Sequence, residues 1–358
     1  MDFDLSQEQQ LLQETLRQFA ANECPPTRVR QIFDAEEELD RELWNGLVEL
    51  GVGGLHLPEE YGGAGLSLLD LALAAEVLGW GAVPGPFLGH ALAGLAITLG
   101  GSPEQKQRWL PKLATGDALG TVAFRDSEGG WLSSDWTARA NGVLEGAKRA
   151  VPQGAQADLI VVGTAGGGLA LVEAGIDGVE AKSVDGADRT RRLHDLSFSG
   201  APCDPLPRGA EVADRVTDAG LLLLAADAFG GASRLVETCV EYAKTREQFG
   251  VTIGHFQALK HQLANMAIEV EPARGLYWYA AHAADHLPDD RERAAALAKA
   301  HLTDLYLQVA RDSVEAHGGI GFTWECDVQI WFKRAMFDRA FLGLPALHRE
   351  RAATLAAW

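Results

Sequence analysis

Cysteine is scarce in this sequence, and its few cysteines are not arranged to hold a metal. The 358 residues include four, at Cys24, Cys203, Cys239 and Cys326, with no CxxC pair or other metal-ligand spacing. We therefore expect no metal site and reduced thiols, as in cytosolic proteins. The first ten residues, MDFDLSQEQQ, are acidic and polar, unlike a signal peptide, so the expected location is the cytoplasm.

Positive charge and long apolar runs are also in short supply. The chain has 31 Lys and Arg against 50 Asp and Glu, a formal net charge of -19. Because nucleic acids require a basic surface, we expect no nucleic-acid partner. A nucleotide cofactor stays compatible with this charge, since one arginine acts over a short range. No run of about 18 apolar residues is present, so we expect no membrane partner.

Helical signals dominate the two ends of the chain. Ser6 and Gln9 have the spacing of a capping box, and Ser102-Pro103 opens another helix with proline at its first position. An apolar stripe at helical spacing runs from Leu222 to Ala243. Further helices are predicted from about 256 to 284, 290 to 315 and 326 to 340, and long helices with short connections favour a four-helix bundle.

The middle of the chain has the pattern of a β domain. Two apolar runs, 159–162 and 169–172, are separated by three consecutive glycines, which predicts a hairpin rather than a Rossmann loop. Residues 143–146 and 136–138 are predicted as further strands. The sequence thus predicts a mainly α protein with a central β domain: an N-terminal α-helical domain (1–118), a small β-barrel or sandwich (119–208) and a C-terminal four-helix bundle (209–358).

Two motifs carry chemical information. The first is YAKTREQFGVTIGHFQALKHQLANM (242–266), in which Arg246 follows a helix and precedes Gly250. A guanidinium group fits a pyrophosphate, although a helix-end cation without a ligand has the same local pattern. The second is HGGIGFTWE (317–325), whose glycines allow backbone amides to approach a phosphate or a flat ring.

Together with the order of the domains, these motifs resemble the acyl-CoA dehydrogenase family. The resemblance covers nearly the whole chain; it is strongest at 57–65, 101–117, 242–266 and 316–325, and poor across 121–155. It implies FAD as cofactor, an acyl-CoA substrate, and an electron-transfer flavoprotein as acceptor. In the family, the first motif contacts a flavin bound mostly by a neighbouring subunit. The implied FAD contacts here are Arg246, Gln248, Phe249, Phe256, Gln257, His317, Gly318, Gly319 and Gly321.

The family's catalytic carboxylate is missing from both of its usual positions. Such a base removes the α proton while the β hydrogen leaves as hydride to the flavin. The resemblance places the usual base at Leu342, and the alternative position at about Gly220. Asp227 is a weak candidate for a relocated base, and a helix-contact role is its other interpretation. The catalytic residue is therefore unknown.

The segments that in the family surround the chain's own flavin also depart from the pattern. The first is Ala123 to Gly130, and the second is Ala150-Val151-Pro152. Alanine cannot wall a flavin ring, and proline lacks a backbone donor. Trp131 and Trp136 are possible substitutes for the missing wall.

This pattern resembles the base-lacking subunits of heteromeric actinobacterial-type acyl-CoA dehydrogenases. Our hypothesis is a subunit that completes the FAD site of an α2β2 heterotetramer, whose second acyl-CoA dehydrogenase chain supplies the base. One alternative is a self-sufficient homotetramer with a relocated base. Another, from a different class, is a non-catalytic acyl-CoA-binding or scaffold protein.

Overall fold

The computed structural model describes residues 4–126 and 130–357, and the chain divides into two compact units. The bundle unit comprises Met1–Arg30, Ala72–Val83 and Leu221–Trp358, and the sheet unit comprises Gln31–Leu71 and Pro84–Gly220. Segments distant in sequence therefore share one unit. The sequence predicted three consecutive domains, which is a different division from these two units. The three domains remain a prediction.

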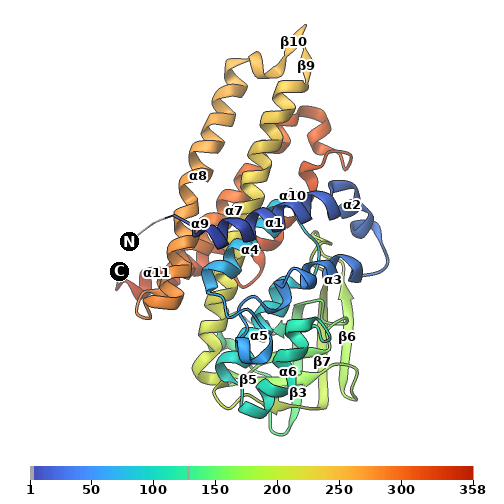
Figure 1. The fold of residues 1–358 in the computed structure, drawn as a ribbon, viewed down its shortest axis with the longest axis vertical. Helices are drawn as coiled ribbons and strands as arrows, with labels where there is room; N and C mark the ends of the chain where they lie inside the picture. Colours follow the sequence, from blue (N-terminus) through green and yellow to red (C-terminus); the bar gives the residue numbers. More distant parts are fainter. Residues whose placement is uncertain (1–3, 127–129, 358) are drawn as a thin grey trace. The chain divides into compact units, whose positions relative to one another are not determined.

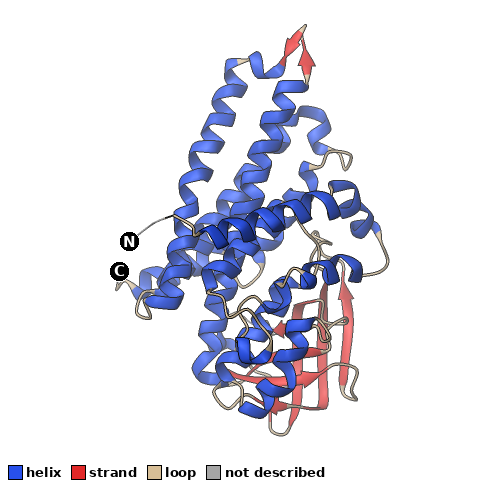
Figure 2. Ribbon diagram, viewed as in Figure 1, coloured by secondary structure: helices blue, strands red, loops and turns tan. Residues whose placement is uncertain are grey.

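The bundle unit is built from helices (Figures 1 and 2). The long helix α7 leads through the short hairpin β9–β10 into α8, and α9 to α11 follow. The bounds are α1 (Gln7–Glu23), α4 (Leu68–Trp80), α7 (Gly209–Thr245), β9 (Glu247–Gln248), β10 (Val251–Thr252), α8 (Gln257–His286), α9 (Arg291–His317), α10 (Val328–Ala340) and α11 (Pro345–Leu355). The first residues of α4 and α7 belong to the sheet unit. The long helices predicted for the C-terminal part are confirmed.

Local sequence signals set several of these helix boundaries. The Ser6 side chain accepts from the amide of Gln9, and the Gln9 side chain accepts from the amide of Ser6, so the predicted capping box is present. By length and composition α7 could cross a membrane, but 83% of its most apolar window is buried inside the structure. Its apolar surface is accounted for by packing, as in the core helix of a bundle.

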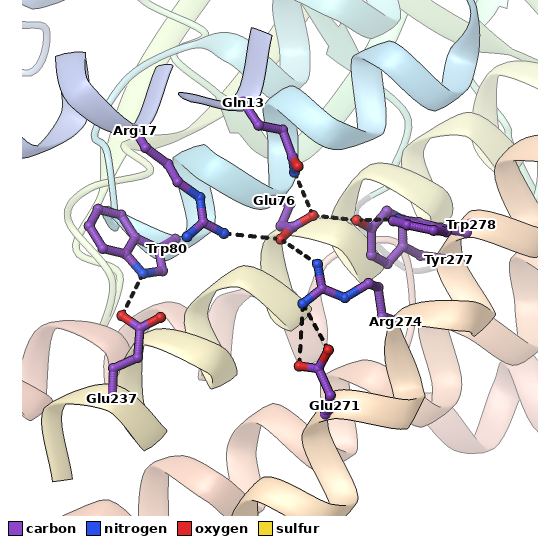
Figure 3. A network of polar contacts seen from close by, with 9 residues as sticks. All are labelled: Gln13, Arg17, Glu76, Trp80, Glu237, Glu271, Arg274, Tyr277 and Trp278. Atoms are coloured by element: carbon purple, nitrogen blue, oxygen red, sulfur yellow. Dashed lines mark hydrogen bonds and ion pairs between the residues drawn. The ribbon is translucent and has the colours of Figure 1, made fainter. Parts of the chain in front are cut away.

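The carboxylate of Glu76 is fully buried within the apolar helix α4 (Figure 3). Gln13 donates to Glu76 Oε2 at 2.9 Å, and the hydroxyl of Tyr277 donates to the same oxygen. Arg17 Nη2 and Arg274 Nη1 lie 3.4 and 3.7 Å from Glu76 Oε1. Burial, with the negative charge of Glu76, raises the pKa of Tyr277 well above its ordinary value, so its hydroxyl remains a donor. The network joins α4 to α1 and α8.

The sheet unit contains a β-sandwich. One sheet has the order β1-β4-β5-β8 and the other β2-β3-β7-β6. Side chains from both sheets form one apolar core, which includes Val162, Leu144 and Phe198. The strands are β1 (Gly120–Ala123), β2 (Arg139–Ala140), β3 (Val143–Pro152), β4 (Leu159–Thr164), β5 (Gly168–Glu173), β6 (Val179–Val184), β7 (Leu193–Pro202) and β8 (Asp204–Pro205), with helices α3 (Arg41–Glu49), α5 (Phe87–Gly100) and α6 (Pro103–Thr115) in the same unit; α2 (Pro26–Asp34) spans both.

The predicted hairpin of 159–172 is confirmed, because β4 and β5 pair antiparallel across the glycine turn. The strand predicted at 136–138 is wrong, since the neighbouring strand β2 covers only Arg139–Ala140. The amide of Thr137 donates to the carboxylate of Asp126 instead of to a strand. Trp136 is buried against Phe124, with ring centroids 5.0 Å apart. A contact between distant residues therefore overrides the local strand pattern.

Two buried histidines of the sheet unit give the protein a predictable sensitivity to acid. His90 Nε2 lies 3.1 Å from the carbonyl of Gly53 and 3.2 Å from that of Leu113, so this nitrogen carries the proton. Nδ1 accepts from the amide of Gly120 at 3.3 Å. Burial lowers the pKa of His90 to about 4, and that of His56 likewise to about 4.

In the unfolded chain both histidines bind a proton near the ordinary histidine pKa of about 6.5. The stability that comes from their lowered pKa in the folded chain is therefore fully present above about pH 6.5, and it is lost as pH falls through 4. We expect His90→Gln to reduce the difference in unfolding free energy between pH 7 and about pH 4.5 by about 2 kcal/mol. Urea denaturation at the two pH values measures it. His301→Gln, at an exposed position, is the control. An unchanged pH dependence in His90→Gln would contradict the assignment.

Candidate functional site

The first motif lies at one end of α7, in the bundle unit (Figure 1). Arg246 directly follows the helix; its amide donates to the carbonyl of Tyr242 at 2.8 Å, and its carbonyl accepts from Ile253 at 2.8 Å. These bonds fix its backbone, while its side chain is exposed. Within residues 4–126 and 130–357 the Arg246 guanidinium has no ion pair, so it is open to an anion from outside this chain.

A tight hairpin carries the aromatic residue of this motif into solvent. Phe249 and Gly250 connect β9 to β10, with φ of 55° and 79°. A two-residue hairpin turn with both φ positive suits glycine, but costs free energy at a phenylalanine. Phe249 is 92% exposed, and its ring lies edge to face with that of Phe256, with centroids 6.1 Å apart. An exposed ring on a strained turn is typical of a residue that contacts a ligand or partner.

The remaining predicted contacts of this motif are also accessible. Gln248 lies in β9 and is exposed, and its side chain donates to the neighbouring carbonyl of Glu247 at 2.8 Å. Phe256 is the N-cap residue of α8, and Gln257 is the first residue of that helix and exposed. The structure thus places Arg246, Gln248, Phe249, Phe256 and Gln257 together at the hairpin end of the bundle unit.

The second motif forms a short 3₁₀ turn, Gly318–Phe322, between α9 and α10. Gly318 has φ 65° and ψ -144°, a conformation that only glycine adopts readily. A Cβ on Gly318 or Gly319 would meet no atom within 4 Å, whereas one on Gly321 would lie 2.2 Å from the carbonyl oxygen of Val314. The turn therefore packs against α9 on one side and is open on the other.

His317 joins the two ends of this candidate site. It is the last residue of α9, and its ring stacks on Tyr242 of α7 with centroids 4.3 Å apart. Exposed apolar side chains follow it in the turn, including Phe322 at 75% exposure. The structure thus links the predicted His317, Gly318, Gly319 and Gly321 to the helix that carries Arg246.

The two positions at which the family resemblance expects a base are both apolar and buried. Leu342 is fully buried, with φ 58°, and its carbonyl accepts from His348 Nε2 at 2.9 Å. Gly220 is buried within α7. The structure therefore presents no carboxylate at either position.

Asp227, the weak candidate for a relocated base, is buried against an arginine. Nη1 of Arg334 donates to both carboxylate oxygens of Asp227, at 3.2 and 3.0 Å. Nη2 of the same arginine donates to the carbonyl of Val83 at 3.0 Å. This geometry favours the helix-contact interpretation, because both carboxylate oxygens of Asp227 already accept from Arg334.

In the sheet unit, the strand that carries Ala150 uses its backbone donors internally. The amide of Ala150 donates to Asp195 Oδ1 at 3.1 Å, and that of Gln153 donates to the carbonyl of Arg192 at 2.8 Å. Ala150 has φ 54°, within a register shift of the β3–β7 pair between Lys148 and Val151. These amides are occupied and cannot reach a ligand as the strand stands.

The tryptophans considered as replacement walls occupy different environments. Trp136 is buried, stacked on Phe124 and close to Gly163, where a Cβ would lie 2.5 Å from its indole. Its ring is therefore packed between Phe124 and the backbone of β4. Trp131 is only half-buried and lies under the guanidinium of Arg125, 5.6 Å from the ring centroid. Residues 127–129, part of the first loop, lie outside the described residues.

A helix bundle with an exposed arginine and a glycine turn, next in sequence to a β-sandwich, is the arrangement expected of a flavin-dependent oxidoreductase. The family model "Acyl-CoA dehydrogenase, N-terminal domain" matches residues 6–117, and "Acyl-CoA dehydrogenase, C-terminal domain" matches residues 207–355. The chain belongs to the acyl-CoA dehydrogenase family, and its cofactor is FAD.

Named relatives agree with this assignment. The chain is 34% identical to acyl-CoA dehydrogenase IpdE2 of Mycobacterium tuberculosis, covering 95% of this chain and 94% of that protein. A structure of a variant of the Tcur3481-Tcur3483 steroid ACAD has TM-score 0.91 at 32% identity, covering 98% of each chain. The ChsE4-ChsE5 complex from Mycobacterium tuberculosis has TM-score 0.89 at 29% identity, covering 100% of this chain and 99% of that chain.

Two features of the site were not anticipated from the sequence. Glu76 is the only charged residue after Asp70 in α4. An isolated charge in an apolar helix indicates a buried polar contact, so the sequence did contain evidence for this network. The stacking of Tyr242 on His317 had no such signal, because the two rings come from different helices.

Proposed function

We propose that this chain is one subunit of a heterotetrameric acyl-CoA dehydrogenase, and that it completes a flavin site bound mainly by a second, related chain. The observation that carries the proposal is Arg246, whose backbone is held by hydrogen bonds and whose guanidinium is exposed and without an ion pair in the described chain. Arg246 lies at the hairpin end of the bundle unit, where Phe249 is also exposed. The Tyr242–His317 stack joins this end to the open glycine turn. These groups suit the phosphates and flat rings of a dinucleotide.

The rest of the chain supports a role as partner. Leu342 is buried and apolar at the usual base position, and Ala150 donates its amide to Asp195. The residues that would contact the flavin of a neighbouring subunit are thus present. Those expected around this chain's own flavin are absent or make hydrogen bonds within the chain. Two similar structures, the Tcur3481-Tcur3483 steroid ACAD and the ChsE4-ChsE5 complex, each carry the names of two proteins. These names support a heteromeric assembly that acts on a bulky acyl-CoA.

In this assembly, bound FAD would accept the hydride from the β carbon of the acyl-CoA thioester. The contribution of this chain would be to bind: Arg246 would neutralise the pyrophosphate, and the Gly318–Phe322 turn would offer backbone to the dinucleotide. The second chain would hold the catalytic carboxylate. An electron-transfer flavoprotein would reoxidise the flavin.

Purification through a tag on this chain tests the proposal. The isolated chain is expected to be colourless and inactive, whereas the assembly from its native cells should contain a second acyl-CoA dehydrogenase chain and one FAD per pair. A yellow, active protein from this chain alone would support the homotetramer with a relocated base instead. An assembly that binds acyl-CoA but no flavin would support the non-catalytic alternative.

Arg246→Ala gives the matching quantitative prediction. Loss of a charge-assisted contact to the pyrophosphate is expected to weaken FAD binding to the assembly about 10- to 100-fold. FAD fluorescence quenching on titration of the flavin-free assembly measures it. Arg311→Ala, an exposed arginine of α9 outside both motifs, is the control and should leave FAD affinity unchanged. Equal affinity in Arg246→Ala and wild type would contradict the proposed function.

A further inference from the structure

The groups that we propose to bind a dinucleotide lie on two segments that are separated in sequence. Arg246 directly follows α7, and the glycine turn Gly318–Phe322 follows α9. A ligand that contacts both segments requires them to hold a fixed distance. The glycine turn itself offers little for this purpose, since Gly318 and Gly319 have no side chain and are open to solvent.

His317 is held in one tautomer immediately before that turn. Its Nδ1 lies 2.8 Å from the carbonyl of Ser313, one turn earlier in α9. A carbonyl only accepts, so Nδ1 carries the proton and Nε2 is left as an acceptor. The Sγ of Cys239 lies 3.9 Å from the same Nδ1. Burial lowers the pKa of His317, which favours the neutral ring.

The face of the imidazole is stacked on α7. The rings of Tyr242 and His317 are inclined by only 23°, with centroids 4.3 Å apart. Tyr242 is also the residue whose carbonyl accepts from the amide of Arg246 at 2.8 Å. A short chain of direct contacts therefore runs from Arg246 through Tyr242 and His317 to Gly318.

The glycine turn has further contacts at Gly321. Gln329 of α10 donates to the carbonyl of Gly321 at 2.6 Å, and a Cβ on Gly321 would lie 3.1 Å from the Cβ of His317. The turn thus packs directly against His317. Displacement of the imidazole would move the turn relative to α7.

We propose that His317, stacked on Tyr242, is a positioning residue that fixes the glycine turn relative to Arg246, so that both engage one dinucleotide. This inference rests on the proposed function. A purely structural role would lower stability without changing how strongly Arg246 contributes to FAD binding. A positioning role makes the contribution of Arg246 depend on the stack.

A double-mutant cycle between Tyr242 and Arg246 separates these two roles. The variants are Tyr242→Leu, which removes the stacked ring, Arg246→Ala, and both together, with Tyr242→Phe as the variant that retains a ring. Each is purified as the flavin-free assembly and titrated with FAD. Thermal unfolding of each variant reports whether it remains folded.

The expected result is FAD binding weakened about five-fold in Tyr242→Leu and restored in Tyr242→Phe. The effects of Tyr242→Leu and Arg246→Ala should be less than multiplicative in the double variant. If Arg246→Ala weakens FAD binding but Tyr242→Leu does not, or if the two effects multiply, the positioning role is overturned and the proposed function stands. If Arg246→Ala leaves FAD affinity unchanged, the proposed function fails, and the inference fails with it.

The tautomer of His317 gives a readout that needs no flavin. In the folded chain, nitrogen-detected NMR of the imidazole is expected to show a proton on Nδ1 and a neutral ring at pH 7. Tyr242→Leu should shift the His317 resonances, and Tyr242→Phe should leave them nearly unchanged. A proton on Nε2 in the wild type would overturn the geometry on which the positioning role rests.

Discussion

Replacement of Arg334 by methionine is expected to lower the free energy of unfolding by about 3–5 kcal/mol. The Arg334 side chain is fully buried, and its guanidinium donates to both oxygens of Asp227 and to the carbonyl of Val83. Methionine retains much of the volume but removes the positive charge. Asp227 would then remain in an apolar interior with its principal cation gone, which is the most costly way to break a buried ion pair.

Removal of both charges should recover most of this loss. The double variant Asp227→Leu with Arg334→Met leaves no buried charge at this position and is expected to lie within about 1–2 kcal/mol of the wild type. Chemical denaturation of the three proteins measures the series. Arg208→Met, at an exposed ion pair with Glu211, applies the same substitution where solvent screens the charges and should cost less than about 1 kcal/mol. A double variant as unstable as Arg334→Met alone would contradict this account.

The same double variant decides whether Asp227 takes part in catalysis. If Asp227 is only a helix contact, an assembly that contains the double variant should turn over acyl-CoA within a few-fold of the wild type. If Asp227 is a relocated base, turnover should fall by about 10²-fold or more, because proton abstraction loses its acceptor. The single variant Asp227→Ala cannot make this distinction, since it leaves Arg334 buried without its carboxylate.

The sequence predicted those parts of the fold that depend on neighbouring residues. The capping box at Ser6, the helix start at Ser102 and the β4–β5 hairpin each follow from a few adjacent residues, and each is present. The strand predicted at 136–138 failed because its pattern was local, whereas Asp126, which binds the amide of Thr137, lies 11 residues away. The bounds of α8, α9 and α10 were predicted to within a few residues, whereas the apolar stripe from Leu222 to Ala243 did not show the start of α7 at Gly209.

In the candidate site, too, features set by neighbouring residues were predicted, and contacts between residues distant in sequence were not. The motifs identified Arg246 and the glycines, whose roles depend on local backbone geometry. No sequence pattern indicated that Tyr242 stacks on His317, or that Asp227 pairs with Arg334, 107 residues later. For Asp227 the residue type alone allowed both a base and a helix contact. Only the position of the arginine favours one of them.

Substitution of Gly230 by alanine is expected to lower the free energy of unfolding by about 3 kcal/mol or more. Here α4 and α7 cross so closely that a Cβ on Gly230 would lie 1.8 Å from the carbonyl oxygen of Glu76 and 2.9 Å from the amide nitrogen of Trp80. On the facing helix, a Cβ on Gly79 would lie 2.1 Å from the carbonyl oxygen of Asp227. These neighbours are backbone atoms, so no rotation of a side chain relieves the overlap, and the two helices must separate.

Gly275 provides the matched control, because it is an exposed glycine within α8 and a Cβ there would meet no atom within 4 Å. Gly275→Ala should raise stability by about 0.5–1 kcal/mol, since alanine lowers the entropy of the unfolded chain and favours helix. Denaturant midpoints of the two variants should therefore move in opposite directions. A Gly230→Ala protein within about 0.5 kcal/mol of the wild type would show that the crossing has more room than its geometry indicates. Separation of α4 from α7 should also weaken FAD binding to the assembly, because Tyr242 lies in the last turn of α7 and Arg246 directly follows it. Gly275→Ala should leave FAD binding unchanged.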